Sequence, residues 1–145
     1  MRRRGTPSAG DTCGGARQRQ IISARMAPLL KHLALLVHDL SKARRFYETY
    51  FGFDADSEWQ GTALFIRNDE GFDLALMRGE HPPNPGAFHH FGFHVADPAE
   101  VQLLHNRLLV DDVPILEFVN EPDLLSFKCV DPDGYTVEVY SDLGA

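Results

Sequence analysis

The sequence predicts an α+β fold built from two copies of a strand–helix–three-strand unit (βαβββ), whose strands form a cupped, mostly antiparallel sheet. Apolar runs of strand length recur along the chain, and two amphipathic helical stripes separate them. The same order of elements begins again after a Pro- and Gly-rich break at 79–86. At an offset of 58 residues His32 falls on His90, and Asp39 falls on Asp97.

The first unit opens with the apolar run at 30–37, which has the length of a strand. A helix is expected at 41–51, because apolar side chains recur there at helical spacing. Asp39 or Ser41 can cap its first amides, and Gly52 is well placed to end it. Three further strands are predicted, at 53–58, 61–67 and 72–77.

The second unit repeats this order from a strand at 90–95. Asp97 is a capping acid, Pro98 suits the first helical position, and Glu100 completes a capping box. The apolar stripe of the following helix runs from Val101 to Leu108. The remaining strands are predicted at 113–118, 125–130 and 135–140.

Charge divides the chain unevenly. Residues 1–28 carry a net charge of +5 and read as a disordered basic extension, whereas residues 29–145 carry −12 and read as one domain, with modules at 29–79 and 87–145. An acidic domain disfavours nucleic acid as a partner, and no apolar stretch is long enough to span a membrane. Two cysteines give no disulfide framework, which fits a reducing, cytoplasmic setting.

Strand alternation brings three potential metal ligands to one face. His32 shares its face with Ala34, and His90 shares its face with Gly92 and His94, opposite the apolar side chains that should pack on the helices. In the last strand Glu138 points the same way by the same argument. A carboxylate on a covered sheet face is costly unless it is paired or binds a metal.

Two imidazoles and one carboxylate can hold a divalent cation such as Fe, Mn, Zn, Ni or Co and leave positions open for a small-molecule substrate. The alternative is three unrelated residues on a polar face. Two further residues are candidates for catalysis. His94 lies on the inward face and could carry a proton, and Lys128 could hold an anionic or phenolate substrate if its face is the cup, or be a solvated lysine if not.

The sequence resembles the vicinal oxygen chelate superfamily (glyoxalase, bleomycin resistance protein and dioxygenase). HLALLVHDLSKARRFYETYFGF looks like the opening of its first module, HFGFHVADPAE like that of its second, and SFKCVDPDGYTVEVY like its closing hairpin. The resemblance covers residues 30–141 and implies paired βαβββ modules, a metal bound at the positions of His32, His90 and Glu138, and a homodimer that builds each site from two subunits.

Departures from the family patterns narrow the expected chemistry. Glyoxalase I relatives have a further glutamate ligand where this chain has Ala75, and the nearest carboxylate is Asp73, which leaves open whether Asp73 is a fourth ligand. Fosfomycin-modifying thiol transferases carry a phosphonate-binding arginine after the closing glutamate, whereas no basic residue follows Lys128 here. Bleomycin-resistance proteins generally lack the metal triad.

Three hypotheses follow from the sequence. The first is a metal-dependent enzyme, weakly dioxygenase-like. The second is a metal-independent protein that sequesters a small apolar or cationic compound in a dimer cleft, for which Trp59, Phe65 and Phe88 are suitable. The third is a glyoxalase-type lyase or isomerase that uses the same metal.

Overall fold

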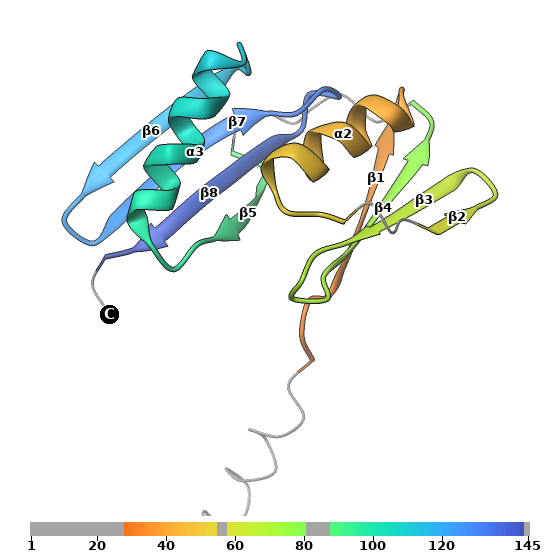
Figure 1. The fold of residues 1–145 in the computed structure, drawn as a ribbon, viewed down its shortest axis with the longest axis horizontal. Coiled ribbons are helices and arrows are strands. Elements are labelled where there is room, and N and C mark those ends of the chain that lie inside the picture. Colours follow the sequence, from red (N-terminus) through yellow and green to blue (C-terminus); the bar gives the residue numbers. More distant parts are fainter. Residues whose placement is uncertain (1–27, 55–57, 81–87, 144–145) are drawn as a thin grey trace, which may run out of the picture. The chain divides into compact units, whose positions relative to one another are not determined.

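The computed structural model describes residues 28–54, 58–80 and 88–143. They form two four-stranded sheets, each with one helix packed on it (Figure 1). The predicted α+β class with two βαβββ units is therefore confirmed. The predicted basic extension lies outside the described residues except at its last position, and so does most of the predicted linker.

The first module contains strands β1 (His32–Val37), β2 (Glu58–Gln60), β3 (Ala63–Arg67) and β4 (Asp73–Arg78), and helix α2 (Leu40–Tyr50). Its sheet has the order β1-β4-β3-β2. The first strand pairs with the last in parallel, and the other pairs are antiparallel.

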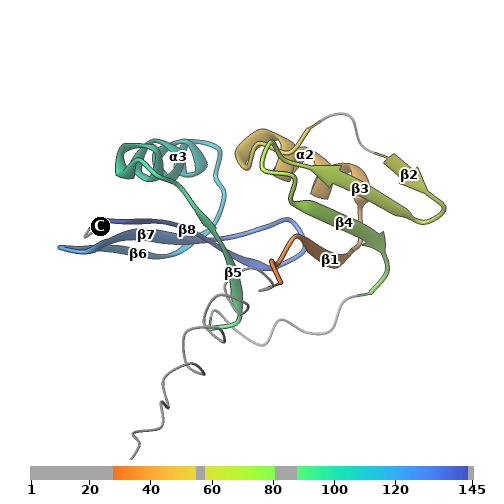
Figure 2. The same ribbon diagram turned by 90° about the horizontal axis from the view of Figure 1, so that it is seen from below.

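The second module repeats this topology. Its strands are β5 (His90–His94), β6 (Ile115–Glu121), β7 (Leu124–Val130) and β8 (Thr136–Asp142), and its helix is α3 (Pro98–Val110). The sheet order is β5-β8-β7-β6, again with the first and last strands parallel. Figure 2 shows α3 lying over β7 and β8, the two strands that it contacts most.

Both helices begin at the predicted capping residues. The Asp39 carboxylate accepts the amide protons of Ser41 and Lys42, and the Asp97 carboxylate accepts that of Ala99. Pro98 occupies the start of α3, where backbone N–H groups have no acceptor within the helix, so the N–H that proline lacks costs no hydrogen bond. Gly52, which follows the C-cap residue Phe51 of α2, adopts a φ of 67°, a conformation that a side chain disfavours.

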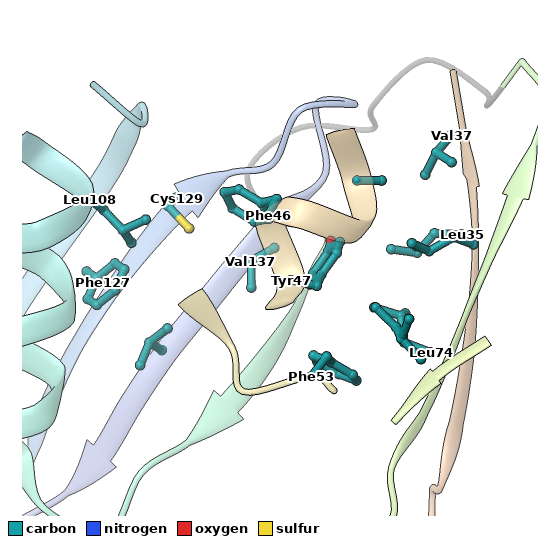
Figure 3. Close-up of a cluster of buried hydrophobic side chains, with 14 of the residues drawn as sticks. Leu35, Val37, Phe46, Tyr47, Phe53, Leu74, Leu108, Phe127, Cys129 and Val137 are labelled. Atoms are coloured by element: carbon teal, nitrogen blue, oxygen red, sulfur yellow. The ribbon is translucent and has the colours of Figure 1, made fainter. Parts of the chain in front are cut away.

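One hydrophobic cluster joins the two modules, and α2 lies at its centre (Figure 3). Phe46 faces Val137 and Cys129 of the second sheet, while Tyr47 lies on the side toward Leu35 of the first. All five side chains are at most 7% exposed. Because one helix contributes to both halves of this core, the modules stabilise each other.

A buried hydrogen bond reinforces this junction. The Tyr47 hydroxyl donates to Asp131 Oδ2 at 2.7 Å, and Asp131 Oδ1 accepts the backbone N–H groups of Asp133 and Tyr135. Burial raises the pKa of Asp131, against the lowering effect of these hydrogen bonds. The turn that precedes β8 is thereby attached to the helix of the other module.

Most boundaries lie within two residues of those predicted, and two differ more. The strand expected at 53–58 is observed as β2 at 58–60, while Phe53 forms an isolated bridge to Asn68. Strand β6 continues to Glu121, so that Pro122 and Asp123 alone connect it to β7, although the polar run around them reads as a longer loop. In the described part of the chain no helix is long and apolar enough to cross a membrane.

Candidate metal centre

His90 and Glu138 face each other on the second sheet. Parallel pairing of β5 with β8 sets Gly92 opposite Glu138, and the imidazole of His90 reaches the carboxylate from two residues earlier. His90 Nε2 lies 3.0 Å from Glu138 Oε2, with side chains 26% and 19% exposed. Donor atoms at this separation can both lie within the roughly 2.1 Å ligand distance of one transition-metal ion.

The protonation of His90 makes this contact informative. Its Nδ1 lies 3.0 Å from the carbonyl oxygen of Phe88, which can only accept, so Nδ1 carries a proton. In the neutral, Nδ1-protonated ring, Nε2 and Glu138 Oε2 both direct lone pairs toward one point, where a proton or a metal ion can lie between them. The pair is therefore chemically suited to hold a divalent metal.

Gly92 leaves room for the Tyr140 ring next to Glu138. A Cβ added at Gly92 would lie 3.3 Å from Tyr140 Cε1, which is a tight contact, and 3.6 Å from Glu138 Oε2, which is an ordinary van der Waals contact. A side chain that extends beyond Cβ would press on the tyrosine ring and would also reach toward the carboxylate.

Lys128 lies on the face that carries Glu138. This is the position that the first of the two alternatives, a lysine that holds an anionic substrate, requires. Register pairing places Lys128 opposite Glu138 on one side and opposite Glu117 on the other. Its ammonium forms an ion pair with Glu117, and the Lys128 side chain is 18% exposed. Lys128 is therefore a partly buried, neutralised cation next to the candidate ligands, and Glu117 is a neighbour that sequence reasoning missed.

His94 lies on the same face but further along β5, opposite Tyr140. The two rings are 5.2 Å apart between centroids, and His94 Nε2 is 3.7 Å from Asp142 Oδ2. Tyr140 also lies against Gly92, so its ring stands between His94 and the His90–Glu138 pair.

His32 lies in the other sheet with different partners. Its Nδ1 is 2.7 Å from Asp73 Oδ2, and Asp73 Oδ1 accepts from Arg67 Nε at 3.0 Å. Among residues 28–54, 58–80 and 88–143 no three His, Cys, Asp or Glu side chains gather closely enough to hold a metal. The structure thus brings together two of the three predicted ligands, His90 and Glu138, and places His32 with Asp73.

Strand register also shows which residue of the first module is equivalent to Glu138 of the second. Ala34 lies opposite Ala75 in the first sheet, as Gly92 lies opposite Glu138 in the second. Asp73 lies two residues before Ala75, directly opposite His32. The position equivalent to Glu138 in the first module therefore carries no ligand atom.

The aromatic residues suggested for a sequestering cleft do not share one face. Phe65 lies on the His32 face, with ring centroids 6.5 Å apart. Trp59 pairs with the buried Leu64, which places it on the helix-covered face instead. Phe88 lies beside Lys128 in a shallow pocket of the second module and is 91% exposed.

Comparison with known proteins agrees with this architecture. The Glyoxalase/Bleomycin resistance protein/Dioxygenase superfamily matches residues 29–139. Glutathione transferase FosA of Serratia marcescens is 29% identical over 117 residues, which cover 79% of this chain and 82% of that protein. An uncharacterized protein of Pseudomonas aeruginosa is 31% identical over 123 residues, covering 78% of this chain and 88% of the relative.

Solved structures share the fold. A possible glyoxalase from Bacillus cereus is 30% identical with a TM-score of 0.67, covering 78% of this chain and 98% of its own. A mutant of the fosfomycin resistance protein FosX from Listeria monocytogenes, complexed with Mn(II) and 1S,2S-dihydroxypropylphosphonic acid, has a TM-score of 0.68 at 21% identity, covering 83% and 93%. With the family match spanning both βαβββ modules, the chain belongs to the Glyoxalase/Bleomycin resistance protein/Dioxygenase superfamily.

Proposed function

We propose that this chain is a divalent-metal-dependent enzyme that acts on a small, oxygen-chelating substrate. The metal ligands are His90 and Glu138 of one chain and His32 of a second copy. The observation that carries the proposal is the contact of His90 Nε2 with Glu138 Oε2, since the hydrogen bond of Nδ1 to Phe88 turns the other nitrogen's lone pair toward the carboxylate.

The need for a second copy comes from where His32 lies. It is on β1, an edge strand of the first sheet, while His90 is on β5, an edge strand of the second. Among the strands that the structure describes, each of these two has a neighbour in its own sheet on one side only. A homodimer that sets β1 of one subunit near β5 of the other brings the third ligand to the pair, and edge strands are suited to such association.

The ligand set suits Fe, Mn, Zn, Ni or Co, and it leaves coordination positions for substrate. When bound, the metal would act as a Lewis acid that stabilises developing negative charge on a substrate oxygen. Two histidines and one carboxylate are also the set of many non-haem iron oxygenases, which favours a dioxygenase-like reaction. The lack of a ligand atom at Ala75 disfavours the glyoxalase I reaction.

Two side chains of the same face would serve the reaction. Lys128 would orient an anionic or phenolate oxygen, which must compete with Glu117 for the ammonium. His94 would carry protons to or from the substrate, with Asp142 as its nearest acid.

A second candidate function is thiol transfer to a small phosphonate. The likeness to glutathione transferase FosA favours it. The pairing of Lys128 with Glu117 argues against it, because the lysine beside His90 and Glu138 is already neutralised, which leaves the metal as the main attraction for a dianionic phosphonate among the described groups of this face. Turnover of catechols with oxygen, of a glutathione hemithioacetal, and of fosfomycin with glutathione separates the three reactions.

Complementation between two inactive variants tests the shared metal site. His32→Ala and Glu138→Gln, each alone, should bind little Zn²⁺ or Mn²⁺. A heterodimer of the two, isolated with two different affinity tags, contains one intact site, because its wild-type His32 and its wild-type His90 and Glu138 come from different chains. We expect about half of the wild-type metal content per dimer, measured by elemental analysis.

The contrary outcomes are distinct. A heterodimer that binds no metal, although both chains are folded and dimeric, would show that the site is not shared. A wild-type protein that is metal-free and unaffected by added Fe, Mn, Zn or Ni would exclude a metalloenzyme. Tight binding of a small ligand that persists unchanged in His90→Ala would instead favour the sequestering protein. Leu103→Ala, an exposed change on α3, serves as the control.

A further inference from the structure

We propose that Asp73 is a positioning residue for His32, and that Arg67 holds Asp73 in place. In this arrangement Asp73 does not bind the metal but fixes the ring of His32 so that Nε2 presents its lone pair. The inference rests on the proposed function for the role of His32 as a ligand. It assigns Asp73 a role different from the fourth ligand considered from the sequence.

The three residues lie side by side on one face of the first sheet. In the strand register His32 of β1 is opposite Asp73 of β4, and Asp73 is opposite Arg67 of β3. Direct cross-strand neighbours have side chains on the same face, close enough to interact. The arrangement is therefore built into the pairing of three strands.

Each oxygen of Asp73 has its own partner. Oδ2 lies 2.7 Å from His32 Nδ1, and Oδ1 accepts from Arg67 Nε at 3.0 Å. An arginine always donates, so it holds Oδ1 and stops the carboxylate from turning away. The Phe65 ring lies near His32 on the same face, with ring centroids 6.5 Å apart and the planes at 28°.

This geometry selects one tautomer of His32. A carboxylate accepts hydrogen bonds and does not donate them, so His32 Nδ1 carries the proton and Nε2 is the free ligand atom. Carboxylates that accept from the second nitrogen of a metal-binding histidine set its orientation and raise its basicity. His90 reaches the same state through the carbonyl of Phe88. Both histidines thus offer Nε2, by different means.

An isosteric amide tests the inference. In Asp73→Asn the amide oxygen should stay with Arg67, which must donate. The amide NH₂ then faces His32 Nδ1, which has to accept, and the proton moves to Nε2. We expect the nitrogen chemical shifts of His32 in metal-free, ¹⁵N-labelled protein to report this exchange of tautomers. The affinity for Zn²⁺, measured by competition with a chromophoric chelator, should fall roughly 10- to 100-fold.

Removing the arginine should reverse the effect. In the double variant Asp73→Asn with Arg67→Met, nothing holds the amide oxygen, so the amide can rotate and accept from His32 Nδ1. We expect the Nδ1-protonated tautomer to return and most of the Zn²⁺ affinity with it. A residue that only supports the fold would not be rescued by the loss of a second interaction.

Glu48→Gln is the matched control. Glu48 accepts from Arg44 Nε at 2.7 Å on α2, so the same chemical change is made to an arginine–carboxylate pair on another element. It should leave the His32 shifts and the Zn²⁺ affinity unchanged.

Either of two results would overturn the inference: an unchanged tautomer and Zn²⁺ affinity in Asp73→Asn, or a double variant that behaves like the single one. A wild-type protein that binds no metal would instead overturn the proposed function. The nitrogen chemical shifts of His32 in the metal-free protein would then still show whether Asp73 determines its tautomer.

Discussion

Replacing Tyr47 by phenylalanine isolates the buried hydrogen bond between the modules. The change removes one hydroxyl, so the aromatic contacts of Tyr47 in the core are kept, while Asp131 Oδ2 loses its donor at 2.7 Å. A hydrogen bond to a charged group contributes about 1.5–3 kcal/mol. Because Asp131 Oδ1 keeps two backbone donors, we expect a loss of about 2 kcal/mol in the free energy of unfolding at pH 7, or about 8 °C in Tm for a domain of this size.

The loss should depend on pH in a defined direction. Burial raises the pKa of Asp131 above its ordinary 3.8, and the hydrogen bond from Tyr47 lowers it. A raised pKa means that the stability contributed by the protonated acid is complete below 3.8 and is lost as the pH rises through the folded-state pKa. The hydroxyl offsets part of that loss once Asp131 is ionised. Tyr47→Phe should therefore cost more at pH 7 than at pH values where Asp131 is protonated.

Urea unfolding followed by far-ultraviolet circular dichroism, at pH 7 and at about pH 4, measures both effects. Tyr50→Phe is the matched control, because Tyr50 lies on the same helix and its hydroxyl donates to Asp111 at an exposed position. The control should change stability by less than about 0.5 kcal/mol. Equal stability of the two variants, or the same cost of Tyr47→Phe at both pH values, would contradict this role of the buried hydrogen bond.

Three further predictions concern the second module. Gly92→Val should weaken Zn²⁺ binding with little change in Tm, since its methyl groups would push the Tyr140 ring and the ligand carboxylate aside; unchanged affinity would contradict this. In a Cys13→Ser background, native protein at pH 8 should not react with a thiol reagent until denaturant is added, because burial raises the pKa of Cys129 to about 12. Lys128→Met should increase the affinity for Zn²⁺ and decrease the affinity for an anionic catecholate, because it removes a positive charge beside the ligands. Titration calorimetry measures both affinities, and a change of both in the same direction would contradict this effect of the charge.

Periodicity in the sequence was enough for the fold and for much of the candidate site. The offset that superimposes His32 on His90 predicted two equivalent modules, and alternation put Glu138 on the face of Gly92, as the register shows. Alternation alone would not have placed Glu117 beside Lys128. A register shift between Ile115 and Glu117 changes the parity of β6, and such an irregularity leaves no mark in the hydrophobic pattern.

Contacts between elements were harder to foresee than the faces within them. Asp73 opens its strand directly opposite His32, but this follows only from the pairing of the first and last strands of the module. The bond from Tyr47 to Asp131 joins residues 84 positions apart, and the sequence around Asp131 indicates only a turn. Local patterns specify which side of a strand a residue occupies, whereas its partner depends on strand order.

The parallel pairing of first and last strands has a consequence for folding. His32 and Asp73 are 41 residues apart, and His90 and Glu138 are 48 apart, so each contact spans almost a whole module. Contacts of such long range require the closure of a long loop, whose entropic cost opposes their formation. A nascent or partly unfolded module therefore cannot present either histidine in its final environment, and the environment of these two rings reports on whether each module has closed.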